Sequence, residues 1–137
     1  MLPKIEKIAV LKGSGLFASA PDHLLLTIAG LVEEQEFDVG KPLYLKGETG
    51  TSMFFVVRGE VRIHDGDREL RIVTDGEPFG ELGVFDRGPR PATATATHDA
   101  MVLQLDEDVF NDLITEHPEV AMNAIDLLVA RLWGSPP

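Results

Sequence analysis

Residues 79–93 contain the residue types that best suit the binding of an anion. Gly80 and Gly83 carry no side chain, so a ligand can approach the backbone closely there. A helical turn that starts near Glu81 would point free backbone N–H groups at such an anion. Arg90 adds a planar guanidinium, which binds phosphate through two parallel hydrogen bonds and keeps its charge. The pattern predicts a local site for a phosphate group.

The carboxylate of Glu81 suits a different part of the same ligand. It cannot usefully face a phosphate, because both groups are negative. It can instead accept hydrogen bonds from the hydroxyl groups of a sugar attached to that phosphate. Glu81 is also a first-turn helix residue of the kind that the helix dipole favours. Arg90 and Glu81 together therefore indicate a sugar phosphate.

Other chemistries are not supported by the spacing of the residues they need. The four histidines fall in four different predicted elements, and none forms a His-x-His pair followed by Glu, so a cupin-like metal site is not indicated (His23, His64, His98 and His117). No serine lies in a G-x-S-x-G elbow. The chain has 0 cysteines, which excludes disulfides and thiolate sites. We expect a binding domain rather than an enzyme, with no metal and no cofactor.

The composition describes one domain of a reducing compartment. A chain of 137 residues with 44% apolar content can bury a full core without disulfides. Its net charge of −11 repels nucleic acid and anionic membranes, so an anionic ligand must be held locally. The longest apolar run, 24–32, is shorter than the roughly 20 residues of a membrane span. We expect a cytoplasmic location, no direct membrane insertion and no nucleic-acid contact by this chain.

Helical patterns occupy residues 1–31 and 107–133. Ser19 precedes Asp22 by three residues in a capping-box pattern, and Gly30 marks the end of that helix. Asp106 is a candidate N-cap, and Pro118 suits a first helical position. The apolar positions expected to be buried in these helices are Ile5, Ile8, Ala9, Leu24, Leu25, Ile28, Leu31, Phe110, Leu113, Ile114, Ala121, Ala124, Ile125, Leu128 and Leu132.

The period changes to that of β-strands between residues 32 and 106. Short runs rich in Val, Ile, Phe and Thr are separated by glycines, which we expect to be turn residues (Gly40, Gly47, Gly50 and Gly59 among them). Asp65-Gly66 is predicted to be a two-residue hairpin turn with positive φ at both positions. Many short strands favour a mainly β fold, a jelly-roll β-roll with flanking N- and C-terminal helices. We expect residues 1–137 to form one such domain.

Residues 79–93 resemble the phosphate-binding cassette of the cyclic nucleotide-binding domain family, which reads approximately F-G-E-L-A-L-x-x-x-x-P-R-x-A-T. Gly83 replaces the common Ala of that pattern. The glycines at 40, 47, 50 and 59 also lie where that family turns between strands, and the resemblance covers nearly the whole chain. The positions that match the cassette are Phe79, Gly80, Glu81, Leu82, Pro89, Arg90, Ala92 and Thr93.

The resemblance implies a regulatory sensor for a cyclic nucleotide. It implies that Arg90 binds the cyclic phosphate, that Glu81 binds the ribose 2′-OH, and that backbone N–H groups near Leu82 and Gly83 complete a site bordered by Gly80, Pro91 and Ala92. The ligand would then shift an equilibrium of the C-terminal helices. Leu132 or Trp133 is the candidate cap over the purine base.

Pro91 departs from the family pattern. The residue after the arginine is usually Ala, Ser or Thr, whose N–H also contacts phosphate, whereas proline has no N–H. Losing one charge-assisted donor weakens binding by roughly 1.5 to 3 kcal/mol, about ten-fold to a hundred-fold. A ligand-free interaction domain with a degenerate site is therefore the alternative. In the family, a Thr at this position favours cGMP. Position 91 is not Thr, which points to cAMP, with cGMP as the remaining alternative.

The partner that receives the signal is not named by the sequence. A transcription factor that joins such a sensor to a DNA-binding helix-turn-helix would need sequence outside this chain. The apolar stripe of the last helix fits either the core of the domain or a partner helix, so a homodimer is possible.

Overall fold

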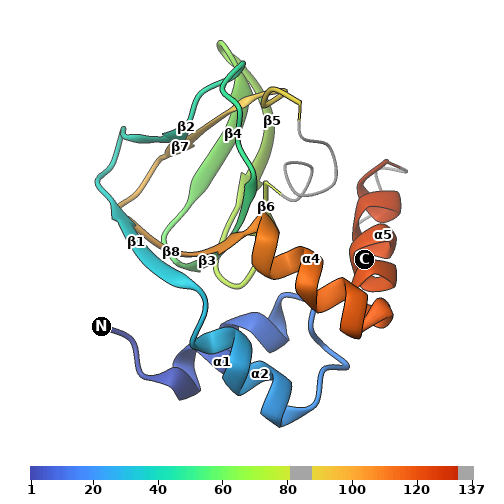
Figure 1. The fold of residues 1–137 in the computed structure, drawn as a ribbon. Helices are drawn as coiled ribbons and strands as arrows, with labels where there is room; N and C mark the ends of the chain where they lie inside the picture. The colour runs from blue at the N-terminus through green and yellow to red at the C-terminus, as the bar shows by residue number, and fades with distance from the viewer. Residues whose placement is uncertain (81–87, 133–137) are drawn as a thin grey trace.

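The computed structural model describes residues 1–80 and 88–132 and shows a roll of two antiparallel sheets with helices gathered at one end (Figure 1). One sheet has the strand order β1-β8-β3-β6, and the other has β2-β7-β4-β5. This is the mainly β roll with flanking helices that the sequence predicts. The strands are β1 (Glu33–Phe37), β2 (Pro42–Tyr44), β3 (Ser52–Arg58), β4 (Val61–Asp65), β5 (Arg68–Val73), β6 (Pro78–Phe79), β7 (Thr93–Ala96) and β8 (Ala100–Asp106).

Four helices are described, α1 (Lys4–Gly13), α2 (Asp22–Ala29), α4 (Glu107–Glu116) and α5 (Pro118–Leu132). Pro118 opens α5 and Gly30 follows α2, as predicted. The capping box is wrong, because the N-cap of α2 is Pro21, with no side-chain cap bond. Asp106 does occupy the N-cap position of α4, but its carboxylate accepts a hydrogen bond from Ser52 instead of capping the helix. No described helix is long and apolar enough to cross a membrane.

Strand β3 is buried on both of its faces and separates two apolar clusters. Phe55 packs with the helices, against residues such as Phe17 and Phe110. Phe54 points the other way, into the interior of the roll, where it stacks on Phe79 with ring centroids 5.1 Å apart. Successive side chains alternate between the faces of a strand, so a strand with a core on each side must be apolar throughout. This explains the unbroken apolar run of β3.

Burial on the helices is narrower than their periodicity predicts. Ile5, Leu31 and Ile125 are 76%, 48% and 45% exposed, whereas Ala124 of the same predicted stripe is buried. One side of α5 meets the segment before α2, where the amide of Asn123 donates to the carbonyl of Leu16. A helix packed on one side buries only the positions on that side, so neighbouring apolar residues remain at the surface.

The β4–β5 turn lies one residue later than predicted. Asp65 pairs with Arg68, so the two loop residues are Gly66 and Asp67. Gly66 has φ +59°, and no non-glycine residue in the described chain has positive φ. A glycine with positive φ at the first loop position is typical of a type II′ turn. The turn therefore needs positive φ only at Gly66, and not at two positions as predicted.

Gly59 gives a test of how strictly the roll requires a glycine. Its φ is +98°, and an added Cβ would lie 2.5 Å from the carbonyl oxygen of Asp99, which is backbone and cannot move aside. We expect Gly59→Ala to lower the free energy of unfolding by about 3 kcal/mol from strain plus overlap. Gly66→Ala is the matched control, because its φ is also positive but nothing lies within 4 Å. That variant should lose only about 1 kcal/mol. Urea denaturation compares the two, and equal losses would contradict the steric argument.

Candidate functional site

The backbone of Arg90 is held by the segment that precedes β3. The N–H of Arg90 donates to the carbonyl of Glu48 at 2.8 Å, and the carbonyl of Arg90 accepts from the N–H of Gly47 at 2.9 Å. An isolated bridge between Thr49 and Pro89 adds to this pairing. Arg90 therefore has a defined position although it lies outside the named strands.

The side chain of Arg90 is buried between the two sheets, with 5% of the residue exposed. Its Nη1 donates to the carbonyl of Gly80 at 3.1 Å, and its Nη2 donates to the carbonyl of Ser52 at 2.8 Å. The guanidinium lies over the ring of Tyr44, 4.1 Å from the centroid, and is 5.9 Å from that of Phe54. Carbonyl dipoles and aromatic faces thus surround the cation.

The positive charge of Arg90 is incompletely compensated by the described residues. Its Nε is buried without a hydrogen-bond partner among them. Burial lowers the pKa of Arg90, and the electrostatic effects of Tyr44 and Glu48 oppose that lowering. A desolvated cation gains more from an added anion than an exposed one, because the surrounding dielectric is low. This arrangement suits a ligand with a phosphate.

Two glycines allow the guanidinium to sit where it does. A Cβ added to Gly50 would overlap Nε of Arg90, and one added to Gly80 would lie 3.2 Å from Nη1. We predicted Gly50 only as a turn residue, but it forms a wall of the arginine site. The sequence contains no spacing signal for this role, because residues 50 and 90 meet only through the fold.

The structure describes some of the predicted site residues and not others. It places Gly80 against Arg90, buries Ala92 and leaves Pro91 exposed. The predicted residues Glu81, Leu82, Gly83 and Trp133 lie outside the described part of the chain, and Leu132 is the last residue of α5. Three contacts of Arg90 were not foreseen, namely Tyr44, Ser52 and Phe54.

Ser52 connects the arginine site to helix α4. Its carbonyl accepts from Arg90, while its hydroxyl donates to the carboxylate of Asp106 at 2.7 Å. Gln104 of β8 also donates to that hydroxyl, at 2.9 Å. Asp106 is the N-cap residue of α4. Ser52 therefore contacts both Arg90 and the N-cap residue of α4.

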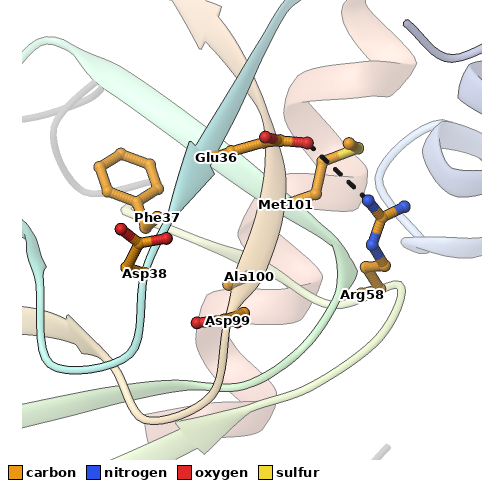
Figure 2. A pocket seen from close by; sticks show the side chains of 7 residues that line it. All are labelled: Glu36, Phe37, Asp38, Arg58, Asp99, Ala100 and Met101. Carbon is orange, nitrogen blue, oxygen red and sulfur yellow. Dashed lines mark ion pairs between the residues drawn. The ribbon is translucent and has the colours of Figure 1, made fainter.

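A second candidate is a pocket of about 220 Å³ at the edge of β1 and β8. Figure 2 shows Glu36 and Arg58 facing each other in it, with 3.8 Å between their charged atoms. Both side chains are more than half exposed, and such ion pairs contribute little. The pocket contains none of the predicted site residues. Its lining residues are Glu36, Phe37, Asp38, Arg58, Asp99, Ala100 and Met101.

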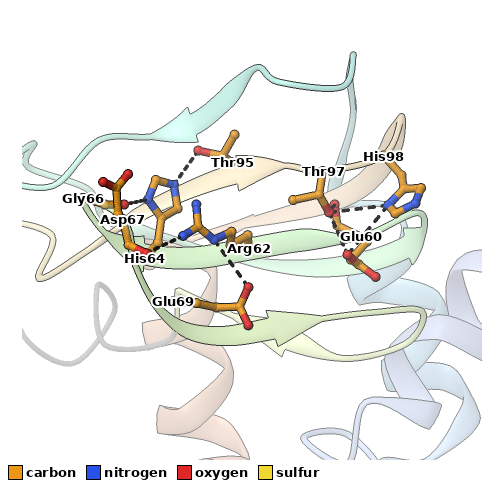
Figure 3. A network of polar contacts seen from close by, with 9 residues as sticks. All are labelled: Glu60, Arg62, His64, Gly66, Asp67, Glu69, Thr95, Thr97 and His98. Atoms are coloured by element: carbon orange, nitrogen blue, oxygen red, sulfur yellow. Dashed lines mark hydrogen bonds and ion pairs between the residues drawn. The ribbon is translucent and has the colours of Figure 1, made fainter.

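A network of polar side chains covers the outer face of the second sheet (Figure 3). The ring of His64 lies between the carbonyl of Gly66 and the hydroxyl of Thr95, each 2.8 Å away. His98 lies 3.7 Å from Glu60. No group of three or more metal-binding side chains occurs in the part of the chain that the structure describes. The histidines described here thus make local polar contacts on separate elements.

Comparison with known families identifies the segment that contains this site. The sequence model described as "Cyclic nucleotide-binding domain" matches residues 34–117. The match spans β1 to the end of α4 and includes Arg90, Ser52 and Tyr44. It also covers residues 81–87, which complete the predicted cassette.

Individual proteins agree with the family match. The chain is 35% identical to the cyclic AMP receptor protein of Thermus thermophilus over 128 residues, which are 89% of this chain and 59% of that protein. The N-terminal domain of a transcriptional regulator from Streptomyces coelicolor is 31% identical, with a TM-score of 0.73 over 91% of this chain and 90% of that one. The regulatory domain of Toxoplasma gondii PKA, crystallised with cAMP, is 29% identical, with a TM-score of 0.74 over 80% of this chain and 43% of that one.

Gly50→Ala tests whether the arginine site depends on this glycine. The methyl group would displace the guanidinium from Gly80 and Ser52, since its Cβ overlaps Nε. We expect about tenfold weaker binding of a phosphate ligand, the cost of about one charge-assisted hydrogen bond. Isothermal titration of cAMP against both proteins measures this. Gly13→Ala is the control, because nothing lies within 4 Å of its added Cβ and its φ, like that of Gly50, is not positive. Unchanged binding in Gly50→Ala would show that Arg90 does not need this position.

Proposed function

This chain belongs to the cyclic nucleotide-binding domain family, and on that premise we propose that it is a sensor module that binds its ligand at Arg90. The observation that carries the proposal is the buried guanidinium, whose Nε has no hydrogen-bond partner among the residues that the structure describes. A cyclic nucleotide carries one phosphate charge, which matches a single arginine. The sugar ring separates that charge from the base, so the two ends of the ligand are read by different residues.

The proposed binding step places the cyclic phosphate against the guanidinium. Arg90 would donate charge-assisted hydrogen bonds to the phosphate oxygens, at the expense of those to neutral carbonyls. Glu81 is the proposed partner of the ribose 2′-OH, and the backbone N–H groups of Leu82 and Gly83 are proposed to contact the phosphate. No covalent bond forms or breaks in this step, so the proposed role is not enzymatic.

We propose cAMP as the first ligand to test, with cGMP as the second. The Thermus thermophilus relative is named for cyclic AMP, and the Toxoplasma gondii structure contains cAMP. The absence of Thr at 91 supports the same order. The preference between the two bases is a separate question from the phosphate contact, because Arg90 interacts with the phosphate alone.

The proposed output runs through α4 and α5. Ser52 accepts from Arg90 and donates to Asp106 at the start of α4, which supports a coupling between ligand and helix. Ligand binding would favour one arrangement of these helices over another, and Leu132 or Trp133 would cap the base in that arrangement. The coupling free energy is set by the ratio of the ligand affinities of the two arrangements.

The wider setting of the module is also a proposal. The chain spans 59% of the Thermus thermophilus relative and 57% of a Mycobacterium tuberculosis regulator, so their full activities do not transfer to it. We propose that the module is cytoplasmic, because the sequence has 0 cysteines and suits a reducing compartment. We also propose that it makes no nucleic-acid contacts of its own, because its net charge is −11. Its output is an unknown domain or protein. We also propose that the chain can form a homodimer through the apolar stripe of α5.

Pro91 supports a second candidate function, an interaction domain that has lost its ligand. Pro91 is exposed and has no N–H to donate. If the site needs that donor, the fold would be retained for contacts with a partner alone. The two candidates differ in one measurable property, the affinity of the purified chain for cyclic nucleotides.

Arg90→Ala tests the leading proposal. At cAMP near 100 times Kd, linkage stabilises the wild type by about 2.7 kcal/mol, a rise of several degrees in Tm. We expect the rise to vanish in Arg90→Ala and to shrink in Arg90→Lys, which keeps the charge but loses the planar fork. Arg62→Ala, on the outer face, is the matched control, and AMP is the control ligand. Equal shifts in wild type and Arg90→Ala would contradict the proposal.

Pro91→Ala separates the two candidates. The new N–H can donate to a phosphate, so we expect binding to tighten by about ten-fold to a hundred-fold if the wild type already binds. Isothermal titration of cAMP and cGMP gives both affinities. Binding that appears only in Pro91→Ala would favour the interaction domain, because the natural site would then be silent.

A further inference from the structure

Tyr44 contacts the guanidinium of Arg90 from the opposite sheet to Ser52. Tyr44 ends β2, in the sheet β2-β7-β4-β5, whereas Ser52 begins β3 in the other sheet. The guanidinium carbon of Arg90 lies 4.1 Å from the ring centroid of Tyr44, well within the range of a cation–π contact. Its Nη2 donates to the carbonyl of Ser52 at 2.8 Å. The side chain of Arg90 is therefore held by both sheets, through a ring in one and a carbonyl in the other.

The segment that follows Tyr44 holds the backbone of the same arginine. The N–H of Gly47 donates to the carbonyl of Arg90 at 2.9 Å, and the N–H of Arg90 donates to the carbonyl of Glu48 at 2.8 Å. Two reciprocal bonds of this kind fix the main chain of a residue on both of its sides. Residues 44–48 thus fix the backbone of Arg90, and the first of them also contacts its side chain.

The ring of Tyr44 is itself held by an aromatic cluster. Its centroid lies 6.0 Å from that of Phe54 and 6.3 Å from that of Phe79, and these two buried rings stack at 5.1 Å. Across the sheet Tyr44 pairs with Ala94, which is fully buried. Packed side chains have little space in which to move. The position of the ring is therefore set by the fold and does not depend on a ligand.

The ring and the hydrogen bonds use different parts of the guanidinium. The ring of Tyr44 lies at the central carbon of Arg90, so this contact uses none of the five N–H donors. A phosphate would compete with the carbonyls of Gly80 and Ser52 for those donors, but it would not compete with the ring. Tyr44 also opposes the lowering of the pKa of Arg90 by burial. The contact with the ring can therefore persist when the hydrogen bonds change partners.

We infer that Tyr44 is a positioning residue, whose ring holds the guanidinium of Arg90 in place for the phosphate of the ligand. This inference rests on the proposed function. Tyr44 acts through Arg90, so its effect concerns the phosphate and is the same for cAMP and cGMP. The property that it needs is the negative face of an aromatic ring, which an aliphatic side chain of similar size lacks.

The first test is isothermal titration of wild type, Tyr44→Leu and Tyr44→Phe with cAMP and cGMP. We expect Tyr44→Leu to weaken both ligands about tenfold, the effect of one desolvated cation–π contact. Tyr44→Phe should keep most of the affinity, because the ring remains. Phe37→Leu is the matched control, since Phe37 is a half-buried aromatic residue that packs against the same interior cluster from the edge strand of the other sheet. Its affinities should equal those of the wild type.

The second test needs no ligand and observes the arginine directly. A ring current shifts the NMR resonances of groups that lie over an aromatic ring, and the guanidinium of Arg90 lies over that of Tyr44. We expect shifted side-chain resonances of Arg90 in the wild type and in Tyr44→Phe, and their loss in Tyr44→Leu. Comparison with Arg90→Ala assigns these resonances. Unshifted resonances in the wild type would overturn the inference even if Tyr44→Leu failed to fold.

Three results of the titration would also overturn the inference. They are equal affinities in wild type and Tyr44→Leu, an equal loss in Phe37→Leu, and a loss in Tyr44→Phe as large as that in Tyr44→Leu. Each of them leaves the proposed function standing if Arg90→Ala still abolishes binding. A wild type that binds neither nucleotide at millimolar concentration overturns both. Circular dichroism and Tm confirm that each variant is folded.

Discussion

The burial of one guanidinium is the constraint on which the site depends. Arg90 is buried away from water, and it donates hydrogen bonds to the neutral carbonyls of Gly80 and Ser52. A buried cation is costly unless dipoles, aromatic faces or an anion replace the lost hydration. The ring of Tyr44 lowers this cost, and the absence of a side chain at Gly50 leaves the space that the guanidinium occupies. An anionic ligand would supply the largest compensation.

The position of β3 between two cores supports the proposed coupling between the site and the C-terminal helices. Phe54 packs in the interior of the roll, and Phe55 packs among the helices. Ser52 begins the same strand and holds both Arg90 and Asp106. A densely packed strand transmits a shift at one end to both of its faces, because close-packed interiors have little space in which to absorb it. The coupling that we propose therefore needs no long chain of intermediates.

The sequence predicts the roll, the cassette and the order of the elements because these follow from local patterns. Strand periodicity, the glycines and the spacing from Gly80 to Arg90 are all visible without a structure. The roles of Tyr44 and Gly50 are not, because they depend on which residues of separate segments meet. The same limit explains the wrong burial predictions on the helices. Periodicity places Ile125 in an apolar stripe, but it cannot show that no other described element packs on that side of α5. The capping box failed for a related reason, since Ser19 fits the pattern but α2 starts after Pro21.

The acidic surface and the cationic interior act over different distances. The net charge of −11 opposes the approach of any anion, but salt screens exposed charges beyond about 8 Å at physiological ionic strength. Arg90 is screened much less, because it is buried. The surface field therefore acts mainly on the rate of encounter, and under our proposal it would repel polyanions such as nucleic acids more strongly than a ligand with one charge. A small ligand with a single phosphate would be repelled only weakly by the surface charges and attracted strongly by the buried guanidinium of Arg90. Under the proposed function, the charge pattern would favour small ligands of low charge whatever base they carry.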